Sequence, residues 1–155
     1  MCVVCYQQLP LVNQIKVPRH AILHHPVDIQ LHRFCNAPLI AYGACIYLRF
    51  IDKIGIINIQ LLITQSRVAP LKIINLSRLE LCGDILLVNL SSKVSQVLTC
   101  TISEQYFWTD SEIVLAWIRR KSSNWQTFVG NRVAELQRLI NIHDWSHMRC
   151  TIRRI

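Results

Sequence analysis

The hydrophobic pattern changes its period once along the chain, and this change constrains the fold more than any other feature. Three short apolar and aromatic runs come first, at residues 31–35, 42–50 and 54–64. Only short connections separate them, which is typical of consecutive antiparallel strands. After residue 72 the apolar residues recur at helical spacing. We therefore predict an α/β (mixed α+β) fold in which helices pack on a mixed sheet.

The segment after residue 72 predicts a long amphipathic helix over residues 79–97, because its leucines and valines fall near one helical face. The string Ser77-x-x-Glu80 fits a capping box at its start, although Ser77 could equally lie in the first helical turn. The remaining pattern predicts a strand, two helices and a last short strand, at residues 99–108, 111–119, 126–140 and 144–148. The predicted order of elements is therefore β-β-β-α-β-α-α-β.

Length and hydropathy exclude several classes of protein. A chain of 155 residues fits one domain with a short extension. Because 52% of the residues are hydrophobic and 17% are charged, the composition excludes an intrinsically disordered chain. No apolar run reaches the roughly 18 residues that a bilayer-spanning helix needs, so we expect a soluble protein without a membrane partner.

Positive charge is concentrated toward the carboxyl end. The net charge is +8, and from Arg119 onward there are eight basic residues against two acidic ones. A basic region of this kind is suited to the phosphates of a nucleic acid. A solvated basic face without a partner is the alternative that charge alone leaves open.

The seven cysteines indicate a reducing compartment. Their number is odd and they are scattered through apolar segments, unlike the paired cysteines of a small secreted disulfide scaffold. We therefore expect an intracellular protein, cytoplasmic or nuclear. Cys2-x-x-Cys5 together with His24 and His25 could supply four zinc ligands, and incidental terminal cysteines are the alternative.

Two of the nine acidic residues lie in the most ordered contexts and are the candidates for chemistry. Glu80 lies at the start of the long helix, and Asp110 follows the strand that ends at Trp108. Carboxylates at such positions can converge on Mg²⁺ or Mn²⁺, which prefer oxygen ligands. The alternatives are purely structural, since Glu80 could complete the capping box and Asp110 could cap the helix that opens at Ser111.

Eight sequence strings resemble the ribonuclease H region of Bel/Pao-type (Pao family) retrotransposon polyproteins. They occur in the family's order between residues 31 and 148, and the segment from Ile15 through Arg19 resembles the connection to the reverse transcriptase side. The strings are RFCNA at 33–37, AYGA at 41–44, SRVAPLK at 66–72, LELC at 79–82, WTDS at 108–111, VLAW at 114–117, WQTFVGNRVAE at 125–135 and WSH at 145–147.

This resemblance implies a ribonuclease H-like fold, with a five-stranded mixed sheet whose first three strands are antiparallel and with helices on both faces. It divides the chain into an irregular lead-in at residues 1–30, a domain at 31–148 and a divergent tail at 149–155, with the family's carboxy-terminal helix missing. The implied reaction is endonucleolytic hydrolysis of the RNA strand of an RNA–DNA hybrid. The implied cofactor is Mg²⁺ (or Mn²⁺), bound as two ions by four carboxylates.

Carried over residue by residue, the family's site is incomplete in this sequence. Glu80 matches the second acid and Asp110 the third, which makes them the expected metal ligands, whereas the first acid is replaced by Asn36 and no residue matches the fourth. An amide removes one negative charge and one strong oxygen ligand, so we predict weak or absent metal binding and impaired or absent hydrolysis. His147 matches a family position near the site, and an ordinary edge-strand histidine is the alternative.

The sequence leaves two other functions open. One is a nucleic-acid-binding module that does not cleave, and the other is a docking module for the reverse transcriptase part of a polyprotein. The basic residues expected to contact nucleic acid are Arg67, Lys72, Arg119, Arg120, Lys121 and Arg132.

Overall fold

The computed structural model describes residues 26–72 and 74–148. Most of the predicted lead-in, the tail at 149–155 and the zinc candidates Cys2, Cys5, His24 and His25 lie outside these residues. The described chain forms β1 (Asp28–Asn36), β2 (Ala41–Ile51), β3 (Ile57–Val68), α2 (Leu76–Val97), β4 (Glu104–Thr109), α3 (Glu112–Ile118), η1 (Ser122–Asn124), α4 (Thr127–Leu139), η2 (Ile142–Asp144) and β5 (Trp145–His147).

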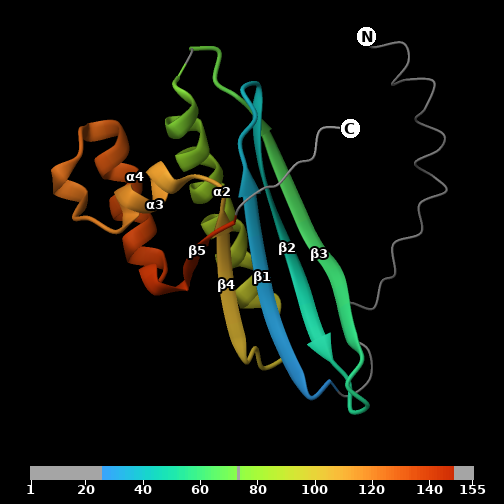
Figure 1. The fold of residues 1–155 in the computed structure, drawn as a ribbon. Coiled ribbons are helices and arrows are strands. Elements are labelled where there is room, and N and C mark those ends of the chain that lie inside the picture. The colour runs from blue at the N-terminus through green and yellow to red at the C-terminus, as the bar shows by residue number, and fades with distance from the viewer. Residues whose placement is uncertain (1–25, 73, 149–155) are drawn as a thin grey trace, which may run out of the picture.

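The five strands form one mixed sheet in the order β3-β2-β1-β4-β5 (Figure 1). β2 pairs antiparallel with both β1 and β3, whereas β4 pairs parallel with β1 and with β5. The turn between β2 and β3 is closed by Asp52 Oδ1, which accepts from the backbone N–H groups of Ile54 and Ile56 at 2.9 Å. Gly55 supplies the positive φ of 85° that this turn requires. The sheet and the antiparallel meander are those predicted.

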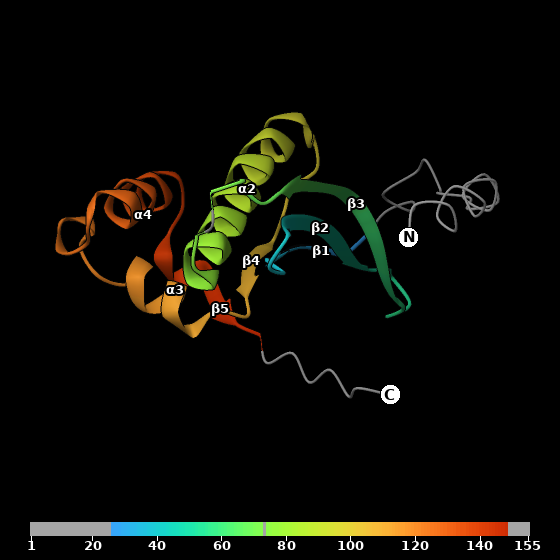
Figure 2. The ribbon, with the colours of Figure 1, turned by 90° about the horizontal axis from the view of Figure 1, so that it is seen from above.

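One face of the sheet carries the core, because alternate residues of β1 and β2 point toward the helices. Ile29, Leu31, Ile46 and Leu48 are buried there, and Leu87 of α2 belongs to the same cluster. Figure 2 shows α2, α3 and α4 on this same side of the sheet. We expected helices on both faces of the sheet. In the described part of the chain, helices cover one face. None of its helices combines the length and apolar character needed to cross a bilayer.

The opposite face of the sheet is lined by aromatic side chains. Phe34 of β1 and Trp108 of β4 stack with ring centroids 6.3 Å apart. His32 stacks on Tyr106 at 5.0 Å, and its Nδ1 accepts from the Trp108 indole N–H at 3.2 Å. At the sheet edge, the exposed apolar side chains of β3 are Ile57, Ile59, Leu61, Ile63 and Val68. This face thus has an ordered surface of its own without a described helix on it.

Element boundaries differ from the predictions where a polar contact decides them. The strand expected from residue 99 begins at Glu104, because residues 99–103 form a connection whose Ser103 N–H donates to the Ile29 carbonyl. The capping box at Ser77 and Glu80 is wrong. The N-cap of α2 is Asn75, whose Oδ1 accepts from the Arg78 N–H at 3.0 Å, so Ser77 lies in the first turn.

We expect Asn75→Ala to lower the free energy of unfolding by about 1 kcal/mol, because the Arg78 N–H would lose its acceptor. Ser77→Ala, in the same helical turn, is the matched control and should change stability by only a few tenths of that amount, at most ~0.5 kcal/mol. Urea denaturation followed by circular dichroism measures both. A larger loss for Ser77→Ala than for Asn75→Ala would contradict the assigned cap.

Candidate active site

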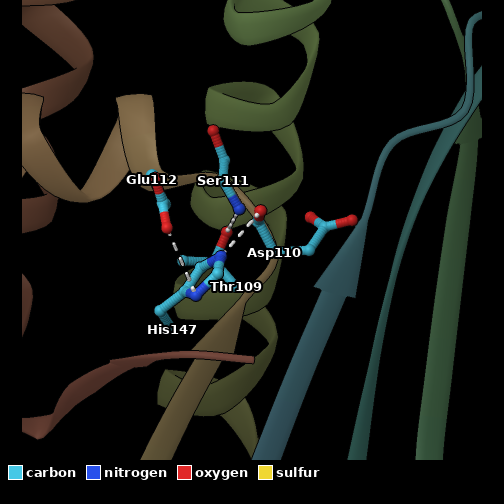
Figure 3. A network of polar contacts seen from close by, with 5 residues as sticks. All are labelled: Thr109, Asp110, Ser111, Glu112 and His147. Atoms are coloured by element: carbon cyan, nitrogen blue, oxygen red, sulfur yellow. Dashed lines mark hydrogen bonds and ion pairs between the residues drawn. The ribbon is translucent and has the colours of Figure 1, made fainter. Parts of the chain in front are cut away.

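The carboxyl ends of β1 and β4 lie side by side at one edge of the sheet. Their parallel register pairs Phe34 with Trp108, so Asn36 and Asp110, each two residues further on, reach the same edge. Asn36 is exposed and Asp110 is half-buried. Figure 3 shows the Asp110 carboxylate pointing away from the neighbouring polar network and toward the end of β1.

Helix α2 brings Glu80 to the same edge. Glu80 Oε2 accepts a hydrogen bond of 2.7 Å from the hydroxyl of Ser111, the residue that follows Asp110. The helix also approaches β1 closely, since a methyl group on Gly83 would lie 3.8 Å from the Asn36 carbonyl oxygen. Asn36, Glu80 and Asp110 therefore come from three elements that meet at this edge.

Capping geometry removes the structural alternatives for both acids. Helix α3 is capped by Ser111, whose Oγ accepts from the Val114 N–H at 3.2 Å, so Asp110 is not the cap. Because Asn75 caps α2, Glu80 does not complete a capping box either. Neither carboxylate caps the N-terminus of a helix. The Glu80 carboxylate instead accepts a hydrogen bond from the Ser111 hydroxyl.

A buried acid that the sequence reasoning missed lies under this edge. Asp84 is 0% exposed, and its Oδ1 accepts a hydrogen bond of 2.6 Å from the buried Cys35 thiol, while its Oδ2 has no partner. Burial is the main cause that raises the pKa of Asp84 to about 7, and the hydrogen bond from Cys35 opposes it; the nearby Glu80 and Asp110 carboxylates contribute to the rise. Asp84 follows Glu80 by four residues, a spacing that places both acids on the same face of α2. This spacing was the sequence signal that could have identified Asp84.

His147 of β5 holds the backbone that carries Asp110 (Figure 3). Its Nε2 donates to the Asp110 carbonyl oxygen at 3.2 Å, and its Nδ1 lies 3.8 Å from Glu112 Oε1. The Met148 N–H donates to the Thr109 carbonyl at 2.9 Å, which closes the same junction. His147 thus lies beside the edge and contacts the Asp110 main chain rather than its carboxylate.

A basic groove begins next to this edge. Arg67 of β3, Lys93 of α2 and Arg132 of α4 line a hollow of about 180 Å³ that also includes Tyr42. Tyr42 and Gly83 are neighbours, so the groove lies beside the helix that carries Glu80. The Arg132 guanidinium lies 3.7 Å from the centroid of the Phe128 ring, which fixes its position. We call this hollow the basic groove.

Two of the six predicted nucleic-acid contacts, Arg67 and Arg132, line the basic groove, and Lys93 was not predicted. The other four do not line it and are exposed elsewhere. They are Lys72 after β3 and Arg119, Arg120 and Lys121 after α3. Lys93 lies among mixed surface residues of α2, so it is identified only by the hollow that it lines together with residues of β3 and α4.

A second hollow, of about 410 Å³, also includes Asn36 in its lining. It is lined by Phe34, Tyr42 and Met148, among other residues, and is mainly apolar. Within residues 26–72 and 74–148, no group of three His, Cys, Asp or Glu side chains is close enough together to hold a metal ion. The edge therefore offers pairs of ligands rather than a closed metal cage.

Several solved structures are similar to this chain at low sequence identity. Ribonuclease H1 of the halophilic archaeon Halobacterium salinarum NRC-1 is 11% identical, with a TM-score of 0.45 over 80% of this chain and 88% of that chain. LC11-RNase H1, solved in complex with an RNA/DNA hybrid, is 12% identical, with a TM-score of 0.46 over 78% and 85%. The protease-reverse transcriptase of prototype foamy virus is 12% identical, with a TM-score of 0.45 over 91% of this chain and 20% of that chain.

No curated protein sequence matches the chain. One family model does, and it covers residues 4–111, which is more than two thirds of the sequence. The match includes β1, α2, β4 and the three edge residues Asn36, Glu80 and Asp110. The resemblance seen in the sequence strings is thereby confirmed, and the chain belongs to the Pao retrotransposon-like RNaseH-like domain family.

Proposed function

We propose that this domain binds RNA–DNA hybrids through its basic groove but hydrolyses their RNA strand poorly or not at all. One observation carries the proposal. Asn36 lies at the end of β1, beside the end of β4 that leads to Asp110, and by resemblance it takes the place of the family's first acid. An amide at this position is neutral and offers a cation one carbonyl oxygen, a weaker ligand than a carboxylate.

The donor set does not fit a two-ion centre. The described residues supply two carboxylates at the edge, Glu80 and Asp110, and one oxygen of Glu80 already accepts from Ser111. Asp84 lies close by, but its pKa of about 7 leaves it largely protonated below that pH. Two divalent ions carry four positive charges, so these two carboxylates leave half of that charge unbalanced. These residues therefore do not fit a two-metal hydrolytic centre.

Retained binding rests on the basic groove. Arg67, Lys93 and Arg132 place three positive charges along a single hollow, and Arg67 and Lys93 are exposed. Cations spaced along a groove contact successive phosphates and release the counterions condensed on the nucleic acid. Such binding needs no metal, so loss of the first acid leaves it intact.

The test measures binding and cleavage of one labelled RNA–DNA hybrid with the same protein preparation. We expect saturable binding that weakens as salt rises, together with cleavage in Mg²⁺ or Mn²⁺ at least about 10³-fold slower than by an active ribonuclease H, equivalent to ~4 kcal/mol of lost transition-state stabilisation. Arg67→Gln and Lys93→Gln should each lower affinity and reduce the slope of log K against log salt by about 0.9.

Lys53→Gln is the control, because Lys53 is exposed in the turn between β2 and β3, at the end of the sheet away from Asn36. It should leave the affinity and the salt slope close to those of the wild type. Fast cleavage that Asp110→Asn abolishes would overturn the proposed impairment. Binding that is independent of salt would overturn the phosphate contacts.

A further inference from the structure

Among the described residues, the largest side chain that is less than 2% exposed is a charged one without a close counter-ion. Arg33 lies in the centre of β1 and is 1% exposed, on the face that packs against α2. Its Nη2 donates to Gln105 Oε1 at 2.9 Å, while its Nε and Nη1 have no hydrogen-bond partner. The guanidinium lies 4.5 Å from the centroid of the Phe107 ring.

Such a group is costly unless its donors are satisfied. Burial lowers the pKa of Arg33 to about 10, and Asp144 opposes this shift, so the guanidinium stays charged at neutral pH. Asp144 is nevertheless no salt-bridge partner of Arg33, since the described residues hold no ion pair between them within 4.0 Å. The buried cation therefore keeps unused donors and unbalanced charge.

Arg33 lies at a cavity of about 450 Å³ between α2, β4 and the segment that joins α4 to β5. The cavity wall is rich in hydroxyl and amide groups, which are suited to donating hydrogen bonds to an anion. These groups belong to Ser91, Ser92, Ser95, Gln96, Gln105 and Asn141. Asp144 also lines the cavity and is its one carboxylate among the described residues. The cavity is large enough for a small ligand.

We propose that this cavity is a binding site for a small phosphate-type oxyanion, which pairs with the Arg33 guanidinium and accepts from the surrounding hydroxyl and amide groups. The site is separate from the carboxyl edge of the sheet. Ser91 follows Glu80 by eleven residues along α2, which corresponds to about 16 Å along the helix axis. The basic groove shares no lining residue with this cavity.

Asp144 is expected to weaken the affinity of the cavity for anions. Its carboxylate faces the same cavity and repels an incoming anion. Asp144→Asn should therefore tighten anion binding by about three- to ten-fold. A merely structural pairing between Arg33 and Asp144 predicts the opposite, because its loss would destabilise the domain without creating affinity.

The experiment is isothermal titration calorimetry of the full 155-residue chain with inorganic phosphate in a chloride buffer, with adenosine monophosphate and acetate as further arms. We expect saturable binding of one phosphate per chain and weaker binding of acetate. Tighter binding of adenosine monophosphate than of inorganic phosphate would assign the oxyanion to a nucleotide, and the reverse to free phosphate. Both results support the site.

Three variants locate the binding. Arg33→Gln should abolish it. Ser95→Glu should also abolish it, because it adds a carboxylate to the cavity from an exposed helix position that the fold tolerates. Lys53→Gln removes one positive charge from a distant turn and should leave the affinity unchanged. Absence of saturable phosphate binding, or wild-type affinity in Ser95→Glu, would overturn the proposal.

Discussion

Asn36→Asp is expected to raise the rate of hybrid cleavage in Mn²⁺ by about 100-fold, which corresponds to ~2.7 kcal/mol of transition-state stabilisation. The substitution restores one negative charge at the end of β1, next to Glu80 and Asp110. A third carboxylate there would share a cation with the other two. Because the described residues would then supply three carboxylates rather than the four that the family resemblance implies, the gain should stop short of full activity. Single-turnover cleavage of a labelled hybrid measures it.

Cation binding provides a second measurement that does not depend on activity. Titration of Mn²⁺ followed by thermal unfolding should show a larger rise in the melting temperature for Asn36→Asp than for the wild type. Asn58→Asp is the matched control, since Asn58 lies near the start of β3, at the opposite end of the same sheet. If Asn36→Asp and Asn58→Asp gave the same cation response, Asn36 would not be at a cation site.

Asp84→Asn is expected to stabilise the domain at pH 8 by up to about 4 kcal/mol and by much less at pH 4.5. The folded-state pKa of Asp84 is raised to about 7, against roughly 3.9 in an unfolded chain. Between these values the folded state binds more protons than the unfolded state, so wild-type stability falls as pH rises from about 4 to 7. Below that window the carboxyl group is protonated in both states, and above it the full penalty of a buried charge applies.

Asparagine suits this test because its carbonyl oxygen can still accept from the Cys35 thiol while the charge is removed. Urea denaturation at several pH values measures the effect. Asp28→Asn, at the half-buried start of β1, is the control and should keep the pH dependence of the wild type. A wild-type stability that does not fall between pH 5 and pH 8 would contradict the raised pKa.

Local patterns were enough to predict most of the elements. Alternation and turn residues located β1, β2 and β3, and the helical period located α2, α3 and α4, because these signals lie within one element. The boundaries failed where a contact outside the pattern decides them. Asn75 rather than Ser77 caps α2, and the connection before β4 is held by a backbone hydrogen bond from the Ser103 N–H to the Ile29 carbonyl. Propensity and period carry no information about such contacts.

The candidate site was predictable in part for the same reason. Glu80, Asp110 and Asn36 could be named from strings that resemble a known family, and the structure brings their elements together at one edge. Asp84 was missed because its raised pKa depends on burial against Cys35, which lies 49 positions away in the sequence. Lys93 was missed because its neighbours Arg67 and Arg132 come from β3 and α4.

By itself the sequence determined the order of the elements, the family and the chemical groups available, including the amide at Asn36. Tertiary structure alone decided which of these groups became neighbours. Strand order and register set β1 beside β4 although some 70 residues separate them, and helix packing then buried Arg33 and Asp84. The physical reason is that burial and charge pairing are properties of residues brought together across the chain, and no local pattern encodes them.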